Sequence, residues 1–537
     1  MHRKSNVSPV VLTVQKKSGN QSSPLLYGVM FEGTNPGLTA YSAVGDVEIS
    51  QDMLNPLSDA ITSTLQVQVM PWETGFAGFV NKGYNGVPVM NATYRCEFWM
   101  RGEYSDVITL QLVGISSDIV YAAHNMTVNS TSRSFTRYET TFNSTASPDG
   151  DNEFRLLFDG SKVPGMKLNF GLIQLFPPTY HSRLTRDGRG IGPLDLLSTV
   201  LGESDWFYPN TDALGLDEYL WWCQDMGMEP VLAVWDGKSF GGILTGSDLQ
   251  PYVDDILDEL EYLLGPPNST YGGMRASNGR EDPWSVRYIE IGNEDDFSGG
   301  CNTYPDRFQQ IYNAISEKYP QLTIVASTID GRCLPEALPG IIYDYHYYRR
   351  PDELAAMFDE WDNQPRSQPV MCSCSEAVHM IGLERNSDVV KMAAYTPLLQ
   401  HFGFTQWSPT LYGFDSGPDS ITLSTSYYVQ KMFSTNRGTT ILPVKTTAEF
   451  GPLYWVASRA NSTYYVKLAN YGEEKQTVHV QVPDTRSGRL EMLSGPRDAS
   501  NRPHNITVQP SVQKVTNQRG SYKFDMAAWA VAVLAVS

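Results

Sequence analysis

The sequence has few cysteines, few basic side chains and no long apolar run. Its 6 cysteines among 537 residues are too few for a disulfide-stapled scaffold. With 40 Lys and Arg against 59 Asp and Glu, the formal net charge is -19, so the chain lacks the basic face that nucleic acid or an anionic membrane requires. No apolar run reaches about eighteen residues, the length that a membrane-spanning helix needs. We therefore expect neither a nucleic-acid partner nor a membrane partner.

Sequence motifs of several enzyme classes are also missing. There is no HExxH pair, no phosphate-binding P-loop and no GxGxxG turn in a nucleotide-binding context. Cys372 and Cys374 are too close together for easy pairing, and no His/Cys set at zinc spacing accompanies them. Cys301 and Cys333 could form one disulfide. We therefore predict no metal and no cofactor.

Asn-x-Ser/Thr acceptors for glycosylation are frequent, and several lie in polar, turn-like contexts. The candidate sites are Asn91, Asn125, Asn129, Asn143, Asn268, Asn461 and Asn505. So many acceptors favour a secreted, extracellular glycoprotein. The first twenty residues are basic but hold no apolar stretch long enough for a secretion signal, so export is inferred from the acceptors alone.

The pattern of apolar residues changes along the chain and divides it into four parts. Residues 1–54 form an N-terminal segment. Residues 55–177 alternate apolar and polar positions between turn clusters, which predicts an antiparallel β-sandwich of carbohydrate-binding type. Residues 178–424 alternate helices with strands, as in the parallel β/α units of a barrel or an open sheet. Single-residue alternation returns over 425–537 and predicts a second sandwich.

Glu294 is the first candidate for chemistry. It stands in RYIEIGNEDD, where an apolar strand ends at a glycine and a cluster of carboxylates follows. Acidic side chains at the carboxyl end of such a strand indicate a catalytic mouth. Neighbouring Glu290, Asp295 and Asp296 are expected to raise the pKa of Glu294 by like-charge repulsion, which suits a general acid for glycoside cleavage. The alternative is a capping or salt-bridged carboxylate in a polar loop.

Several longer stretches resemble one enzyme family, the fungal branch of glycoside hydrolase family 51, the α-L-arabinofuranosidases. The stretches are LLYGVMFEGTN, IEIGNED, YDYHYY, EAVHMIGLERNSDVVKMAAYTPLL and TQWSPTLYGFD. This resemblance implies a catalytic (β/α)8 barrel of TIM type flanked by β-sandwiches, with the N-terminal segment supplying a strand at the barrel edge. It also implies hydrolysis of terminal arabinofuranosyl groups of arabinan and arabinoxylan with retention of configuration.

The resemblance assigns roles to single residues. Glu294 matches the family's acid/base, and Asn293 matches its neighbour at the sugar. Glu32 in MFE matches a substrate-contacting glutamate, and His346 matches the His-rich edge of the sixth strand. Trp407 would line the sugar pocket, with a packing role as the alternative.

The sequence departs from the family where the second catalytic carboxylate would stand. A retaining enzyme needs a nucleophilic carboxylate about 5 Å from the acid, which the family supplies from a GEYA-like motif ending strand seven. Here VMCSC joins the neighbouring helices and no GEY-like motif is present. Glu376 is the default nucleophile by chain order, and its alternative role is a helix-start charge favoured by the helix dipole.

A second interval is also short. Residues 181–213 occupy the place of two β/α units, and one such unit with its second strand needs about 30 residues. We therefore expect an incomplete barrel. The expected function is release of terminal α-L-arabinofuranosyl groups from an arabinose-containing polysaccharide or oligosaccharide. The alternative is a non-catalytic secreted carbohydrate-binding protein derived from such an enzyme.

Overall fold

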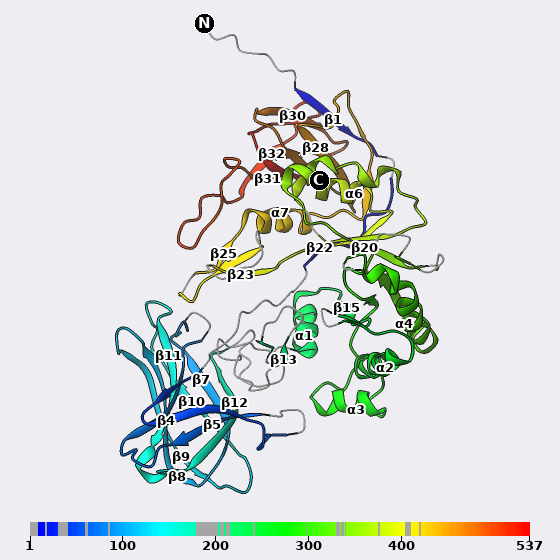
Figure 1. Cartoon of the computed structure of the whole chain (residues 1–537). Coiled ribbons are helices and arrows are strands. Elements are labelled where there is room, and N and C mark those ends of the chain that lie inside the picture. Colours follow the sequence, from blue (N-terminus) through cyan, green and yellow to red (C-terminus); the bar gives the residue numbers. More distant parts are fainter. Residues whose placement is uncertain are drawn as a thin grey trace. The chain divides into compact units, whose positions relative to one another are not determined.

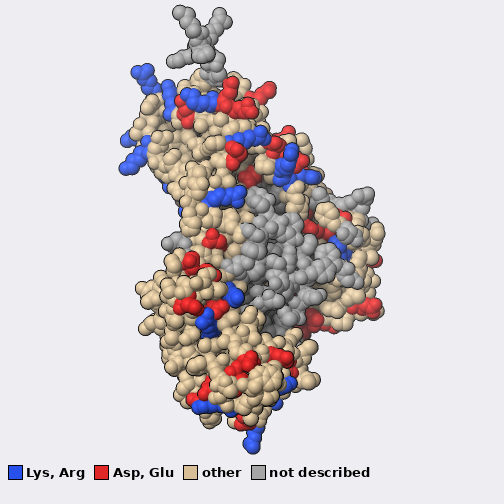
Figure 2. Space-filling view, turned by 60° about the vertical axis from the view of Figure 1, so that its left-hand side comes forward, with Lys and Arg blue, Asp and Glu red and all other residues tan. Residues whose placement is uncertain are grey.

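The computed structural model describes most of the chain. The described residues are 9–16, 19–29, 41–58, 63–83, 86–178, 202–203, 209–210, 215–239, 242–297, 299–328, 333–334, 338, 340–373, 376–402, 410–417 and 420–537. They belong to two compact units, treated separately below. None of the helices in these ranges is long and apolar enough to cross a membrane. Acidic and basic side chains are interspersed on the face shown in Figure 2.

The first unit, called the sandwich unit, comprises residues 33–228 and 414–420. Its two five-stranded sheets have the orders β10-β7-β12-β5-β4 and β3-β6-β11-β8-β9 (Figure 1). Alternate residues face the other sheet, so Phe154, Leu156 and Phe158 are fully buried. The elements are β3 (Tyr41–Val44), β4 (Val47–Asp52), β5 (Thr64–Val69), β6 (Phe76–Asn81), β7 (Thr93–Arg101), β8 (Tyr104–Gly114), β9 (Val120–Ser130), β10 (Thr136–Asn143), β11 (Asn152–Asp159), β12 (Lys167–Phe176), β13 (Gly202–Glu203), β14 (Pro209–Asn210) and α1 (Leu216–Met226).

The sandwich begins earlier than the predicted boundary at residue 55. Both β3 and β4 precede that boundary, and they pair with β6 and β5. Their sequences, YSAV and VEISQD, are short and half polar, so the alternation is weak in the sequence. Val47 and Ile49 nevertheless pack against the sandwich core. Residues 1–54 therefore do not form one segment. Besides these two strands of the first sandwich, they supply one strand to the central parallel sheet and one to the C-terminal sandwich, both described below.

Seven parallel strands form the central sheet of the second unit, called the barrel unit, which comprises residues 1–32, 229–413 and 421–537. Their order is β15-β18-β19-β20-β21-β22-β2. The strands are β15 (Val231–Val234), β18 (Tyr288–Ile291), β19 (Thr323–Ala326), β20 (Ile342–His346), β21 (Val370–Ser373), β22 (Val390–Tyr395) and β2 (Leu25–Val29), and the helices are α2 (Gln250–Leu264), α3 (Thr270–Ser277), α4 (Tyr304–Lys318), α5 (Pro351–Ala356), α6 (Ala377–Arg385) and α7 (Thr425–Ser434). The predicted edge strand, β2, pairs with β22.

Among the described residues, the seven parallel strands do not close on themselves. The strands β15 and β2 stand at the two ends of the sheet order, and within the described residues no ladder joins them. Most of residues 181–213, the interval that is too short for two β/α units, lie outside the described residues.

A second sandwich completes the barrel unit, as the sequence predicts. Its sheets have the orders β27-β1-β30-β33 and β26-β28-β29-β34-β31-β32. The strands are β1 (Val10–Val14), β26 (Thr440–Leu442), β27 (Val444–Lys445), β28 (Leu453–Ala460), β29 (Thr463–Asn470), β30 (Gln476–Gln481), β31 (Ser487–Leu493), β32 (Ser511–Thr516), β33 (Tyr522–Met526) and β34 (Val531–Val536). The N-terminal strand β1 lies between β27 and β30. Buried Lys467 of this sandwich pairs with buried Glu384 of α6, which ties the sandwich to the barrel helices.

Candidate active site

Three polar side chains lie together at the carboxyl ends of the central strands. Side chains alternate along a strand, so Glu290 follows Tyr288 on one face of β18, and Asp344 and His346 follow Ile342 on one face of β20. Tyr288 and Ile342 belong to an apolar cluster. The ligand atoms of Glu290, Asp344 and His346 lie within 4.8 Å of one another. An apolar layer of the sheet is therefore followed by a buried polar layer.

The charges of this polar layer are set by burial and hydrogen bonds. Burial alone would lower the pKa of His346, but hydrogen bonds with Asp344 and Glu294 raise it to about 10. The distance from His346 Nε2 to Asp344 Oδ2 is 2.6 Å. Burial, followed by the charge of Asp344, raises the pKa of Glu290. His346 is thus an imidazolium with both nitrogens engaged, which favours a proton over a metal ion in this cluster.

Glu294 follows β18 in a tight turn that requires glycine. Gly292 has a φ of +88°, and a Cβ built there would lie 2.2 Å from Asp295 Oδ2. The Asp295 carboxylate accepts a hydrogen bond from the backbone N–H of Asn293 at 3.2 Å. Glu294 itself adopts a left-handed φ of 52°, an uncommon conformation for a residue with a side chain. The turn therefore directs Glu294 and Asp295 to different surroundings.

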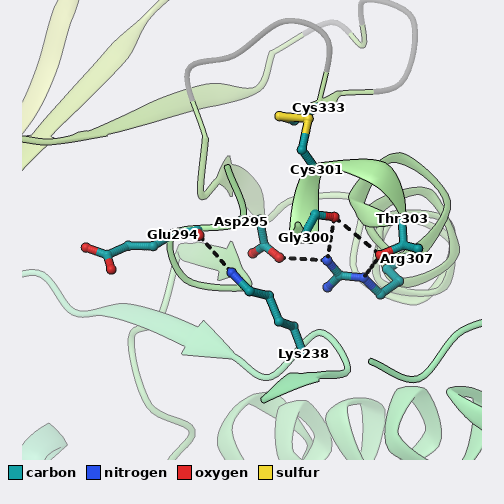
Figure 3. The surroundings of a disulfide bond; sticks show 8 residues. All are labelled: Lys238, Glu294, Asp295, Gly300, Cys301, Thr303, Arg307 and Cys333. Carbon is teal, nitrogen blue, oxygen red and sulfur yellow. Dashed lines mark hydrogen bonds and ion pairs between the residues drawn. A yellow bond between two sulfur atoms is a disulfide. The ribbon is translucent and has the colours of Figure 1, made fainter. Parts of the chain in front are cut away.

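The Glu294 carboxylate is held by donors from β20 and the residues after it. The distance from His346 Nδ1 to Glu294 Oε1 is 2.9 Å, and the Tyr348 hydroxyl donates to the same oxygen at 2.5 Å. Lys238 Nζ donates to the Glu294 carbonyl oxygen at 2.8 Å (Figure 3). The side chain of Glu294 remains 23% exposed. Its second oxygen, Oε2, has no hydrogen bond among the described residues.

The predicted rise in the pKa of Glu294 is wrong. The hydrogen bond from His346 lowers this pKa below its usual range and outweighs burial, and the Tyr348 hydroxyl adds to the lowering. The neighbouring carboxylates do not raise this pKa as predicted, because they interact with other groups. Asp295 pairs with Arg307 at 2.7 Å, and the imidazolium of His346 offsets the charge of Asp344 on β20. Glu294 is therefore ionised at neutral pH.

A buried ion network holds the turn after β18 in place. Arg307 of α4 is fully buried and pairs with Asp236, which follows β15, and with Asp295. Its guanidinium also donates to the Gly300 carbonyl at 3.3 Å. Figure 3 shows Arg307 with Asp295 and Gly300, on the side opposite to the Glu294 carboxylate. The network fixes the turn and leaves Glu294 free to face a ligand.

Cys301 and Cys333, which the sequence allowed as one possible pair, form a disulfide. It joins the turn that precedes α4 to the chain that follows β19, close to Gly300 (Figure 3). The disulfide therefore restrains the backbone next to Gly300, whose carbonyl accepts a hydrogen bond from Arg307.

Comparisons with known proteins identify the family. Residues 187–366 match the α-L-arabinofuranosidase 1 domain, and residues 352–529 match the α-L-arabinofuranosidase C-terminal domain. A probable α-L-arabinofuranosidase A of Emericella nidulans is 50% identical, over 90% of this chain and 99% of that protein. The chain belongs to the α-L-arabinofuranosidase family. An α-L-arabinofuranosidase A of Aspergillus kawachii is 44% identical, over 98% of this chain and 96% of its own length.

The relatives contain segments that this family member lacks. The alignment with the Aspergillus kawachii protein extends over 605 positions, more than the 537 residues here. A solved arabinose-bound α-L-arabinofuranosidase of glycoside hydrolase family 51 is 28% identical and superposes with a TM-score of 0.88, covering 98% of this chain and 100% of that one. The fold of the family is therefore retained despite the shorter sequence.

Glu376, which the sequence predicts as the default nucleophile, lies at the N-cap of α6. Its Oε1 accepts a hydrogen bond from the hydroxyl of Ser426 at 2.9 Å. Burial raises its pKa to about 7. Its place at the start of α6 matches the position of the alternative role, but it makes no side-chain capping hydrogen bond and the raised pKa disfavours the charged form that a helix dipole would stabilise. Glu294 and Glu376 contact different residues.

The other predicted site residues have mixed outcomes. Asn293 is exposed beside Glu294, and His346 contacts Glu294 directly. Glu32 and Trp407 lie outside the described residues. The roles of Tyr348 and Lys238 were not predicted from the sequence. A signal for Tyr348 was present, because it belongs to the YDYHYY stretch and follows His346 by two positions. That spacing places two side chains on one face of a strand.

Proposed function

We propose that this chain releases terminal α-L-arabinofuranosyl groups from arabinan or arabinoxylan by a retaining reaction in which Glu294 is the acid/base. The observation that carries the proposal is the Glu294 carboxylate at the end of β18, held through Oε1 by His346 and Tyr348. The close relatives are named α-L-arabinofuranosidases, and the similar solved structure is arabinose-bound.

The geometry of Glu294 suits proton exchange with a glycosidic oxygen. In the retaining reaction an acid protonates the leaving oxygen while a carboxylate attacks the anomeric carbon, and water then hydrolyses the glycosyl-enzyme with the first residue acting as base. Oε1 of Glu294 is occupied by its two donors, so Oε2 is the oxygen that meets the substrate. His346 and Tyr348 orient the carboxylate and stabilise its charge in the step in which it acts as base.

Glu376 supports a second candidate function, that of a non-catalytic carbohydrate-binding protein. An acid must be protonated and a nucleophile ionised at the same pH. The pKa of Glu294 is lowered by His346, whereas the pKa of Glu376 is raised to about 7 by burial. The fraction of molecules with protonated Glu294 and ionised Glu376 is therefore small at every pH, so this pair is a poor double-displacement couple.

Turnover of an arabino-oligosaccharide decides between the two functions. The hydrolase is expected to release arabinose, and NMR of the first product is expected to show the α-anomer. Loss of turnover in Glu376→Gln would support the default nucleophile, and unchanged turnover would remove Glu376 from the mechanism. Binding of the oligosaccharide without release of arabinose would favour the carbohydrate-binding protein.

The pH profile tests the role of His346. If Glu294 is the acid, one limb of the pH profile of kcat/KM reports its pKa, and in the wild type that limb lies below the ordinary glutamate value of about 4.3. His346→Gln removes the largest cause of the lowering and leaves burial, so the limb is expected to move up by about 1 to 3 pH units. Tyr348→Phe is expected to move it in the same direction by less. An unmoved limb in His346→Gln would exclude Glu294 as the titrating acid.

Secretion and glycosylation are also proposed. The seven candidate asparagines, from Asn91 to Asn505, are all exposed in the structure, as an attached glycan requires. When the chain is expressed through a eukaryotic secretory pathway, peptide N-glycosidase is expected to lower its mass by several glycans. No change in mass would contradict the glycoprotein assignment, and Asn461→Gln is expected to remove a single glycan.

A further inference from the structure

An open pocket lies on the sandwich unit, in a different unit from Glu294. Its volume is about 550 Å³, and its lining comes from β4, β5, β7 and β12 and from the turns at their ends. Ser50, Gln66, Asn169 and Arg101 are cross-strand neighbours in one row. The row lies on the outer face of this sheet, because the alternate residues Leu65 and Phe170 point into the core. The pocket thus belongs to a polar sheet face.

Asp52 organises the base of this pocket. Its Oδ2 accepts hydrogen bonds from the side-chain amides of Asn55 at 2.6 Å, Gln66 at 2.7 Å and Asn169 at 2.8 Å. Asn169 donates its second amide hydrogen to the Thr64 hydroxyl at 3.1 Å. Each amide nitrogen is thus fixed by a buried carboxylate, and no described residue donates a hydrogen bond to the three amide oxygens. The pocket therefore has three preoriented hydrogen-bond acceptors, which suit the hydroxyl groups of a sugar.

Two cations and two apolar side chains border these acceptors. Arg101 donates its Nε to the Ser132 carbonyl at 2.9 Å, which leaves the two terminal nitrogens of its guanidinium for a ligand. Lys167 lines the pocket and has no ion pair among the described residues. Met53 and Leu54 are 69% and 91% exposed, and side chains of this kind pack against the C–H face of a sugar ring. These two cations outnumber the single carboxylate among the lining residues, that of Asp52, so the pocket suits an anionic group.

We infer that the pocket binds a uronic acid residue of a plant-wall saccharide, with sugar hydroxyls on the Asp52-oriented amides and the carboxylate on Arg101 and Lys167. Arginine and lysine both form charge-assisted hydrogen bonds with a carboxylate, and arginine does so in a two-point geometry. The site is separate from Glu294 and does not depend on turnover there.

Calorimetric titration of the full-length chain tests the inference. Glu294→Gln is used as the background so that no saccharide is hydrolysed. The probes are a xylo-oligosaccharide that carries one glucuronic acid and the same oligosaccharide without it. The acidic probe is expected to bind at least about 10-fold more tightly than the neutral one, since one charge-assisted contact is worth about 1.5–3 kcal/mol. The preference is expected to shrink as salt is added.

Variants locate the binding. Lys167→Gln and Arg101→Gln are each expected to weaken the acidic probe about 10-fold or more and to change the neutral probe little. Lys162→Gln is the matched control, because this exposed lysine pairs with Asp106 of the other sheet and the net charge changes equally. Equal affinity for the two probes, no binding of the acidic probe, or the same affinity in Lys167→Gln as in Lys162→Gln would each overturn the inference.

Discussion

Replacing Arg307 with methionine is expected to lower the free energy of unfolding of the barrel unit by about 3–5 kcal/mol. The guanidinium is fully buried and pairs with Asp236 and Asp295, so its removal leaves two buried carboxylates without their cation. Breaking such a pair from one side costs more than the pair contributes, because the remaining charge has lost its compensation. Methionine keeps the volume of the apolar stem, which limits any cavity. The shift in the midpoint of urea unfolding measures the effect.

The pH dependence separates this cause from a packing defect. An unpaired buried carboxylate has a raised pKa and takes up a proton, so the deficit of Arg307→Met is expected to shrink as pH falls from 7 toward 4. A packing defect would stay constant over this range. Arg287→Gln is the control. Arg287 also holds a carboxylate, that of Glu229, but it is 63% exposed, and an exposed pair contributes only about 0–1 kcal/mol. Equal losses in the two variants would contradict the buried-network account.

The order of the elements could be predicted from the sequence where apolar periodicity is strong. The helix α2 has Val253, Ile256 and Leu260 buried on one face, and β18 and β20 are short strands with polar residues at or next to their carboxyl ends. The strands β3 and β4 were missed because they are short and half polar, and because β3 pairs with β6 and not with a strand next to it in the sequence. Periodicity reports which face is buried and does not report which strand is the neighbour.

The position of Glu294 was also predictable, but its electrostatics were not. A glycine and acidic residues after a buried strand indicate a site at the strand end. The pKa of Glu294 depends on His346, which lies 52 positions later in the sequence, on β20, and contacts the Glu294 carboxylate. Counting acidic neighbours along the chain gave the wrong sign because Asp295 turns toward Arg307. In this turn, the residues next to Glu294 in sequence are not the charges that set its pKa.

Glu294→Gln is expected to lower kcat/KM for an arabino-oligosaccharide by about 10²–10⁴-fold, the usual contribution of one acid/base residue. Glutamine keeps the shape of the side chain and accepts hydrogen bonds at its amide oxygen, so the contacts from His346 and Tyr348 can persist while the transferable proton is lost. The initial rate of arabinose release at several substrate concentrations gives the value. Glu317→Gln of α4, which changes one exposed glutamate, is expected to leave the rate unchanged.

The leaving group of the substrate determines how far Glu294→Gln lowers the rate of the first step. A sugar alkoxide is a strong base and cannot depart without a proton, whereas a 4-nitrophenolate departs unaided. The first step of Glu294→Gln is therefore expected to be slowed far less for 4-nitrophenyl α-L-arabinofuranoside than for the oligosaccharide, and the remaining loss reports the base role of Glu294 in the second step. Equal losses on both substrates would assign Glu294 a different role, such as binding the sugar ring, because only protonation of the leaving oxygen distinguishes the two substrates.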